Sequence, residues 1–217
     1  FVSKKEVTLD HLRSSRSERQ IKYRFCIFRG ADMPAWKDFK IGKDTYDLSH
    51  LNYTTFDVIR PSTEASPEKQ VSFFMAFSDH CFTDHFGPSD DWIYTHAKSR
   101  EQRYFCPNRY EHSKNLPTLI PQIIQNNPYI GKTKLGHREQ FFYLEEKILN
   151  VDYRIFFEIN KNTSPNATTD MRINIASAYE PRSTLEFKSV GTSGHHKMWS
   201  VIDAKLSGTP LPDKKKR

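Results

Sequence analysis

The sequence predicts an α+β protein, mostly antiparallel sheet, with a central helix and a C-terminal helix. Three observations predict this fold class. Several stretches alternate apolar and polar side chains as half-buried strands do. One segment between them has its apolar residues at helical spacing, and short connections join the strands that follow it. The order strands, helix, strands, helix is typical of α+β proteins.

The N-terminal part predicts three strands. Residues 21–28 alternate apolar and polar side chains, and residues 53–60 and 71–77 show the same pattern. A loop with two prolines, "PSTEASPEK", separates the second strand from the third. Residues 1–20 have few apolar anchors, so we expect a short helix at most, or an arm.

No period is evident over residues 78–111, which we expect to be an ordered irregular segment because it is rich in aromatic residues. Residues 113–127 then predict the central helix. Leu116, Ile120 and Ile124 belong to its apolar stripe, and Pro121 is expected to kink the helix or delay its start.

The C-terminal half returns to strands and then ends in a helix. The predicted strands are 140–148, 152–159 and 171–179, and their short connections favour an antiparallel meander. Residues 195–208 predict the final helix, with Gly208 as its C-cap. We interpret residues 1–217 as a single domain, with residues 209–217 as a basic tail.

Composition indicates a folded protein with an aromatic core and a polar exterior. The chain has 217 residues with 16 Phe, 10 Tyr and 3 Trp, and its mean hydropathy is −0.73. No stretch is long and apolar enough to span a membrane, so we expect no membrane partner. Three irregularly spaced cysteines argue against a disulfide framework and favour the cytoplasm.

The net charge of +7 points to an anionic partner. Basic side chains outnumber acidic ones in residues 1–30 and 188–217, whereas the middle of the chain is slightly acidic. If both ends lie on one face, that face attracts phosphate backbones. A solvated tail at "KKKR" (214–217) would give part of the same charge without a function.

The stretch "SFFMAFSDHCFTDHFG" (72–87) runs from an apolar strand into a polar cluster. Its His and Cys spacing does not match that of structural zinc sites, so we predict no metal and no other cofactor. We expect Cys81 to be packed in the core. His80 is the candidate proton-transfer residue; alternatively, it is a surface histidine bonded to Asp79 or Asp84.

Residues 96–110 interleave basic and aromatic side chains. Guanidinium groups bind phosphate and aromatic rings stack on bases, so the mixture suits single-stranded nucleic acid. A solvated loop anchored in the core by its rings would have the same sequence. The candidate binding residues are Lys98, Arg100, Arg103, Tyr104, Arg109 and Tyr110.

Residues 113–205 resemble the small-ribonuclease superfamily that contains barnase, EndoU, colicin and RelE-type toxins, including phage and prophage domains. The resemblance rests on a helix followed by "GHREQFF", "YRIFFEI" and "INIASAY". It implies RNA cleavage without metal, with His137 or His195 as base or acid and Tyr179 near the scissile phosphate. The implied cations are Arg138, Arg154 and Lys188.

Three functions therefore remain open. The first is a metal-independent RNA-cleaving enzyme of toxin or prophage type that uses His, Arg, Lys and Tyr. Such an enzyme needs no metal because cleavage by a 2′-hydroxyl requires only a base, an acid and a cation. The second is a nucleic-acid-binding or regulatory module without catalysis. The third is a protein-interaction or anti-defence factor, whose charged ends meet an inhibitor or another partner protein.

Overall fold

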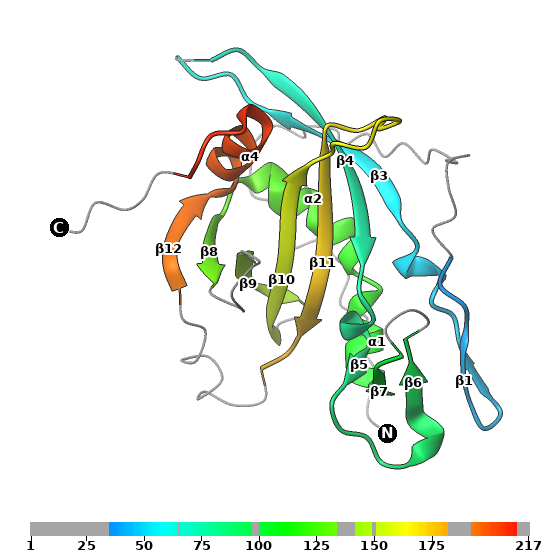
Figure 1. Ribbon diagram of the computed structural model, residues 1–217. Coiled ribbons are helices and arrows are strands. Elements are labelled where there is room, and N and C mark those ends of the chain that lie inside the picture. The colour runs from blue at the N-terminus through cyan, green and yellow to red at the C-terminus, as the bar shows by residue number, and fades with distance from the viewer. Residues whose placement is uncertain are drawn as a thin grey trace, which may run out of the picture.

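A computed structural model describes residues 35–64, 66–96, 100–133, 142–148, 151–181 and 192–211. The expected arm at 1–20, the strand at 21–28 and most of the basic tail lie outside these residues. The described chain is α+β and mostly antiparallel, as predicted, with its strands in one large sheet and two small ones (Figure 1). None of its helices is long and apolar enough to cross a membrane.

The large sheet has seven strands in the order β12-β8-β9-β10-β11-β4-β3. Its neighbours pair antiparallel except β11 and β4, which are parallel, with Met171 opposite Phe73. The sheet is therefore mixed, whereas the sequence predicted only antiparallel neighbours. The strands are β3 (Thr54–Arg60), β4 (Lys69–Phe77), β8 (Tyr129–Thr133), β9 (Phe142–Ile148), β10 (Val151–Lys161), β11 (Met171–Tyr179) and β12 (Thr192–Lys197).

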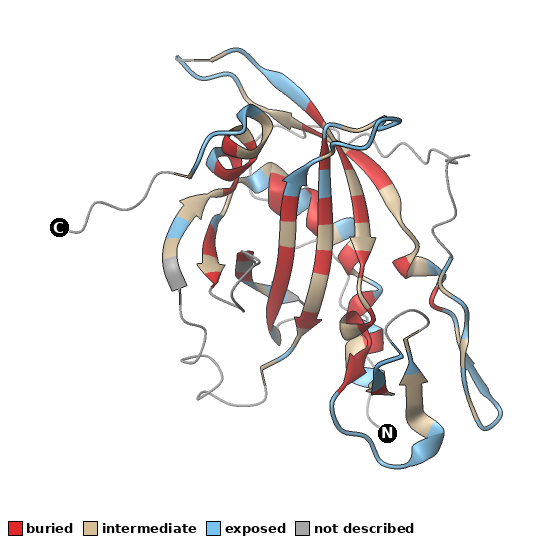
Figure 2. Ribbon diagram, viewed as in Figure 1, coloured by how far each residue is buried: buried red, intermediate tan, exposed pale blue. Residues whose placement is uncertain are grey.

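The predicted strands at 53–60, 71–77, 140–148, 152–159 and 171–179 are confirmed within one or two residues at most ends. Alternation places one face of β4 in the core: Val71, Phe73 and Met75 are each at most 1% exposed. Figure 2 shows this banding along β4 and β11, whereas residues 153–157 of β10 are all buried. Burial of these side chains is the main term that stabilises the sheet.

Three α-helices lie in the described residues: α1 (Pro107–Ser113), α2 (Leu116–Asn126) and α4 (Met198–Ser207). The helix predicted at 113–127 begins later than expected: Ser113 is the last residue of α1, and α2 starts at Leu116. Pro121 lies inside α2 without ending it; Ile120, Ile123 and Ile124 bury their side chains on either side of it. The helix packs against β3, at the edge of the sheet.

The final helix begins later than predicted. Residues 195–197 extend β12, which pairs with β8, and α4 starts at Met198. Gly208 follows the helix with φ +71°, the left-handed conformation expected of a C-cap glycine. That part of the prediction is confirmed.

The segment expected to be irregular, 78–111, is mostly ordered into short elements. They are the 3₁₀ turns η3 (Asp79–Cys81) and η4 (Asp90–Trp92), the strands β5 (Thr83–Asp84), β6 (Ile93–Thr95) and β7 (Gln102–Phe105), and helix α1. The three strands form a sheet of order β5-β7-β6, which lies below the large sheet in Figure 1. Strands this short carry no readable period.

Aromatic rings hold the small sheet together. Phe82 packs edge-on against Tyr94, with ring centroids 5.0 Å apart, and Trp36 packs edge-on against Phe82 at 5.4 Å. Phe105 stacks on Phe39 of β1 (Phe39–Ile41), which pairs with β2 (Asp44–Tyr46). Each such ring pair stabilises the fold by about 0.5–1.5 kcal/mol beyond the burial of its surface. Ring packing therefore stabilises this small sheet, whose short strands form few hydrogen bonds with one another.

Candidate active site around His80

The candidate site begins where β4 ends. Ser78 N-caps the turn η3: its side chain accepts a hydrogen bond from His80 N and donates one to Asp79 Oδ1 at 2.9 Å. Ser78 N is also bonded to Ile175 O of β11. The parallel pair β4 and β11 therefore fixes the backbone that carries His80.

His80 lies between two carboxylates. Its Nε2 is 3.9 Å from Asp79 Oδ1 and 3.9 Å from Glu101 Oε1, and its side chain is 36% exposed. Partial burial lowers the pKa of His80 below its usual value, and the positive charge of Arg103 lowers it further, against the opposing effect of the two carboxylates. The imidazole is therefore uncharged at neutral pH and accessible, as a general base must be.

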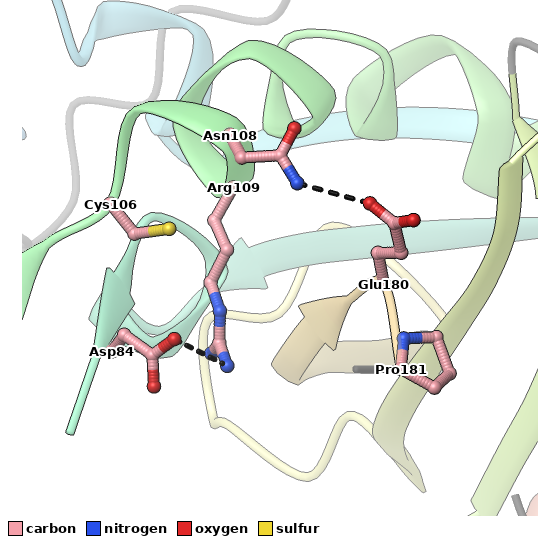
Figure 3. A pocket seen from close by; sticks show the side chains of 6 residues that line it. All are labelled: Asp84, Cys106, Asn108, Arg109, Glu180 and Pro181. Carbon is pink, nitrogen blue, oxygen red and sulfur yellow. Dashed lines mark hydrogen bonds and ion pairs between the residues drawn. The ribbon is translucent and has the colours of Figure 1, made fainter. Parts of the chain in front are cut away.

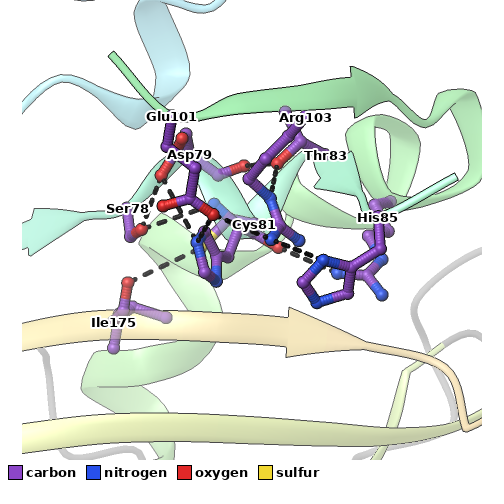
Figure 4. A network of polar contacts seen from close by, with 10 residues as sticks. Ser78, Asp79, Cys81, Thr83, His85, Glu101, Arg103 and Ile175 are labelled. Atoms are coloured by element: carbon purple, nitrogen blue, oxygen red, sulfur yellow. Dashed lines mark hydrogen bonds and ion pairs between the residues drawn. The ribbon is translucent and has the colours of Figure 1, made fainter. Parts of the chain in front are cut away.

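A buried arginine, Arg103, lies between His85 and Glu101 (Figure 4), and Glu101 is in turn 3.9 Å from His80. Arg103 Nε donates to Thr83 Oγ1 at 2.8 Å, and Arg103 Nη1 lies 3.5 Å from Glu101 Oε1 and 3.3 Å from His85 Nδ1. Guanidinium only donates, so His85 Nδ1 accepts and the neutral ring carries its proton on Nε2. The exposed edge of His85 is thus a hydrogen-bond donor.

A second arginine, Arg109, packs beneath the same turn. Its Nη1 donates to His80 O at 3.2 Å, and its Nη2 lies 3.4 Å from Asp84 Oδ2. The guanidinium also lies 4.9 Å from the centroid of the Tyr179 ring. The Tyr179 ring in turn stacks with that of Phe156, with the two centroids 5.8 Å apart. Both contacts hold Arg109 in one orientation.

Arg109 reaches a cavity of about 300 Å³ at the end of β11 (Figure 3). Asp84 and Cys106 line one side, and Asn108, Glu180 and Pro181 line the other. Asn108 Nδ2 donates to Glu180 Oε2 at 3.1 Å, which bridges α1 to the residue after β11. The cavity therefore places one guanidinium between two carboxylates.

Cys81 is packed, as the sequence predicted. It is completely buried, and its thiol donates to Ile175 O over 3.6 Å. Burial raises the pKa of Cys81 to about 12, so the thiolate that a nucleophile requires does not form at neutral pH. Cys81 is part of the core.

Of the predicted site residues, the structure brings together His80, Arg103, Arg109 and Tyr179. Two of them differ from expectation. Arg103 is 2% exposed, so its guanidinium is enclosed by Thr83, His85 and Glu101 rather than open to a phosphate. The Tyr179 ring has Arg109 and Phe156 against it, which leaves little ring surface for a base.

Other predicted residues lie elsewhere. His195 is exposed on β12, four strands from β11 in the sheet order, which is about 19 Å at the usual strand spacing. Arg154 is 1% exposed and paired with Glu145 at 2.9 Å, and Tyr110 is 7% exposed, so neither is free to bind a nucleic acid. Arg100 and Tyr104 are at least partly exposed. His137, Arg138, Lys188 and Lys98 lie outside the described residues.

Sequence reasoning named Asp79 and Asp84 as possible partners of His80 but missed Glu101 and Glu180. Glu101 sits two residues before Arg103 on the chain, and Glu180 follows β11. Both read as ordinary solvated charges. The pairing of Asp84 with Tyr104 across β5 and β7 is what turns Asp84 toward the site, and strands of two to four residues give no signal from which that register could be predicted.

The described residues hold no group of three or more His, Cys, Asp or Glu side chains placed to bind a metal ion. His80, Asp79 and Glu101 come nearest to such a group, yet both ion-pair distances are 3.9 Å. One oxygen of the buried Asp79 carboxylate, Oδ2, has no hydrogen-bond partner among the described residues.

Comparison with known proteins gives a family. No curated protein and no solved structure matches the chain. A family model, described as the YjaZ family, matches residues 38–205, which include the large sheet, the small sheet and every residue of the site around His80. This chain therefore belongs to the YjaZ family.

Proposed function

We propose that this protein acts on RNA and cleaves it by acid–base chemistry at His80 without a metal ion. The observation that carries the proposal is the uncharged, accessible imidazole of His80 between Asp79 and Glu101. A neutral imidazole close to neutral pH is the group best suited to remove a proton from a hydroxyl. The resemblance to small ribonucleases, which covers residues 113–205, implies RNA cleavage without a metal but does not extend to His80.

In the proposed reaction His80 takes the proton of a 2′-hydroxyl. The 2′-oxygen then bonds to phosphorus, the bond from phosphorus to the 5′-oxygen breaks, and that oxygen takes up a proton. The resemblance to ribonucleases implies His137 or His195 as base or acid; His137 is a candidate donor for this last transfer, with water as the alternative. Arg109 supplies the nearest partly exposed positive charge, and His85 supplies a hydrogen bond from Nε2.

Charge at the site limits how RNA can arrive. Asp79, Asp84, Glu101 and Glu180 outnumber Arg103 and Arg109, so the site itself offers a polyanion little attraction. Lys and Arg exceed Asp and Glu in residues 1–34 and 212–217. Under this proposal those segments provide the salt-dependent affinity, and the His80 site provides the chemistry.

A protein-interaction function is the second candidate, and two observations favour it. Acidic residues exceed basic ones over the described part of the chain, and Phe86, next to His85, is 77% exposed. Large exposed rings are enriched where proteins bind one another. This candidate requires no cleavage and no salt-sensitive binding of nucleic acid.

Cleavage of labelled RNA in excess EDTA separates the two candidates. We expect wild-type protein to cut, His80→Gln to lose at least about 100-fold in rate, and His195→Gln to keep its rate because His195 lies at the far edge of the sheet. RNA affinity should change less than about tenfold in His80→Gln. Absence of cleavage by the wild type overturns the proposal, as does equal loss in both variants.

A further inference from the structure

A second cavity, separate from the His80 site, lies between the two main sheets. Its volume is about 410 Å³, within the range of small-molecule sites in proteins. Its walls come from the segment before β1, from β6, from the C-terminal end of β4 and from the first half of β11. Cavities between two packed units of this kind are common ligand sites.

Aromatic and apolar side chains make the inner wall. Trp36, Tyr94 and Phe77 line it, and the rings of Trp36 and Tyr94 are held in place by contacts with Phe82. Rings fixed in this way provide flat surfaces for a planar ligand at little entropic cost. The wall therefore selects for an aromatic or other planar apolar group.

Polar groups gather at the rim. Arg172 and Asn174 reach it from β11, and Lys37 reaches it from the segment before β1. Neither Arg172 nor Lys37 has a carboxylate within ion-pair distance among the residues that the structure describes. Asp38 is the one carboxylate in the described lining, so two cations face one anion.

The ratio of positive to negative side chains around this cavity differs from that of the His80 site. Around His80 each arginine has its own carboxylate neighbour, whereas Arg172 rests against an aromatic ring, 5.7 Å from the centroid of Phe74. A guanidinium on a ring keeps its N–H edge free for a bidentate bond to a carboxylate or phosphate. Burial raises the pKa of Tyr94 to about 12, so its hydroxyl keeps its proton at neutral pH.

We infer that this cavity binds a planar organic anion, with its ring against Trp36 and Tyr94 and its carboxylate or phosphate on Arg172. Asn174 adds an amide that can bond to a polar edge of the ring or to the anion. The site is separate from the proposed RNA chemistry at His80: neither His80 nor its neighbours Asp79 and Glu101 line this cavity, and it shares no lining residue with the cavity beside Arg109.

Calorimetric titration with matched probes tests the inference. The anions are 2-naphthoate and adenosine 5′-monophosphate, and their neutral counterparts are 2-naphthamide and adenosine. We expect at least one anion to bind the wild type, to bind more tightly than its neutral counterpart, and to lose about tenfold or more in affinity in Arg172→Gln. Binding of the naphthoate alone indicates an aryl carboxylate ligand; binding of the nucleotide alone indicates a nucleotide.

Lys147→Gln is the control for loss of a positive charge. Lys147 is 73% exposed on β9, which contributes no residue to the described lining of the cavity, and this variant should bind the anion as the wild type does. Arg172 is exposed, so its replacement should leave the folded protein intact, which circular dichroism verifies. No binding of either anion at about 1 mM, or equal affinity in the wild type and Arg172→Gln, overturns the inference.

Discussion

The Arg109 guanidinium joins the backbone of His80 to the carboxylate of Asp84. It donates from Nη1 to His80 O at 3.2 Å and lies 3.4 Å from Asp84 Oδ2 through Nη2. One side chain of α1 thus fixes both the turn that carries the proposed base and the short strand that follows it.

Arg109→Met should destabilise the protein by about 3 kcal/mol, because Asp84, 5% exposed, loses the positive charge that lies beside its carboxylate. Urea unfolding followed by circular dichroism measures the loss. Arg109→Met combined with Asp84→Asn should recover part of it, since the uncompensated charge is gone. Arg100→Met, the replacement of an exposed arginine, should change stability by less than about 0.5 kcal/mol. A loss as large in Arg100→Met would contradict the role given to the ion pair.

Stability should fall as the pH drops below about 6.5, the usual value for histidine. The pKa values of His80 and His50 are lowered in the folded protein, chiefly by burial, so the unfolded chain binds protons first and acid favours unfolding. The loss of stability is absent above the unfolded-state pKa of histidine, and it is complete once the pH is below the pKa values of His80 and His50 in the folded protein.

Unfolding free energies measured from pH 5 to pH 8 test this dependence. His80→Gln and His50→Gln should each flatten the curve in the acid range. His195→Gln is the control, because the imidazole of His195 is exposed. A curve for His80→Gln parallel to that of the wild type would mean that the folded state does not suppress protonation of His80.

Gly87 should tolerate no side chain. A Cβ at this position would lie 2.3 Å from Tyr104 Cδ1 and 2.5 Å from Tyr104 Cβ, so Gly87→Ala must displace the ring at a cost of about 1–3 kcal/mol. In Tyr104→Gly, which removes both the ring and its Cβ, the same change should cost much less. Gly42→Ala serves as the comparison: its φ of +58° is strained for alanine, yet nothing lies within 4 Å, so its cost should not depend on Tyr104. Thermal unfolding of the single and double variants measures both couplings.

Gln125 protects the outer edge of the large sheet. Its Oε1 accepts from Ile59 N at 3.0 Å and its Nε2 donates to Ile59 O at 2.8 Å, which are the bonds that another strand would make. Gln125→Leu should lose about 1–3 kcal/mol and increase self-association, since the β3 edge becomes available for pairing. Gln122→Leu, at an exposed position of the same helix, should show neither effect in unfolding and sedimentation experiments.

Much of the large sheet could be predicted from the sequence, because strands of seven or more residues show alternation clearly. The run from Val71 to Phe77 alternates buried and partly buried side chains along its whole length. The parallel pairing of β4 with β11 could not be predicted, since it joins strands about 100 residues apart. The short strands β5 to β7 could not be predicted either, because two to four residues define no period.

The candidate site was predicted in part for a related reason. His80 and Arg109 belong to residue types that often do chemistry, so composition pointed to them. Arg103 has the same chemistry, and only the register that places it beside Thr83 and Glu101 shows that it is buried. His195, which the resemblance to ribonucleases suggested, lies on β12, four strands from β11, and its role stays a prediction. Which candidate residues share one site depends on their distances in the folded protein, and residue type alone does not give those distances.

The most direct test of the RNA proposal is the end chemistry of the product from an oligonucleotide that contains a single ribonucleotide. In EDTA, wild-type protein should cut it only after that ribonucleotide and leave a 2′,3′-cyclic phosphate, the product of attack by the 2′-hydroxyl, while His80→Gln should leave it intact. Cleavage of the all-DNA counterpart, or a product without the cyclic phosphate, would contradict the mechanism.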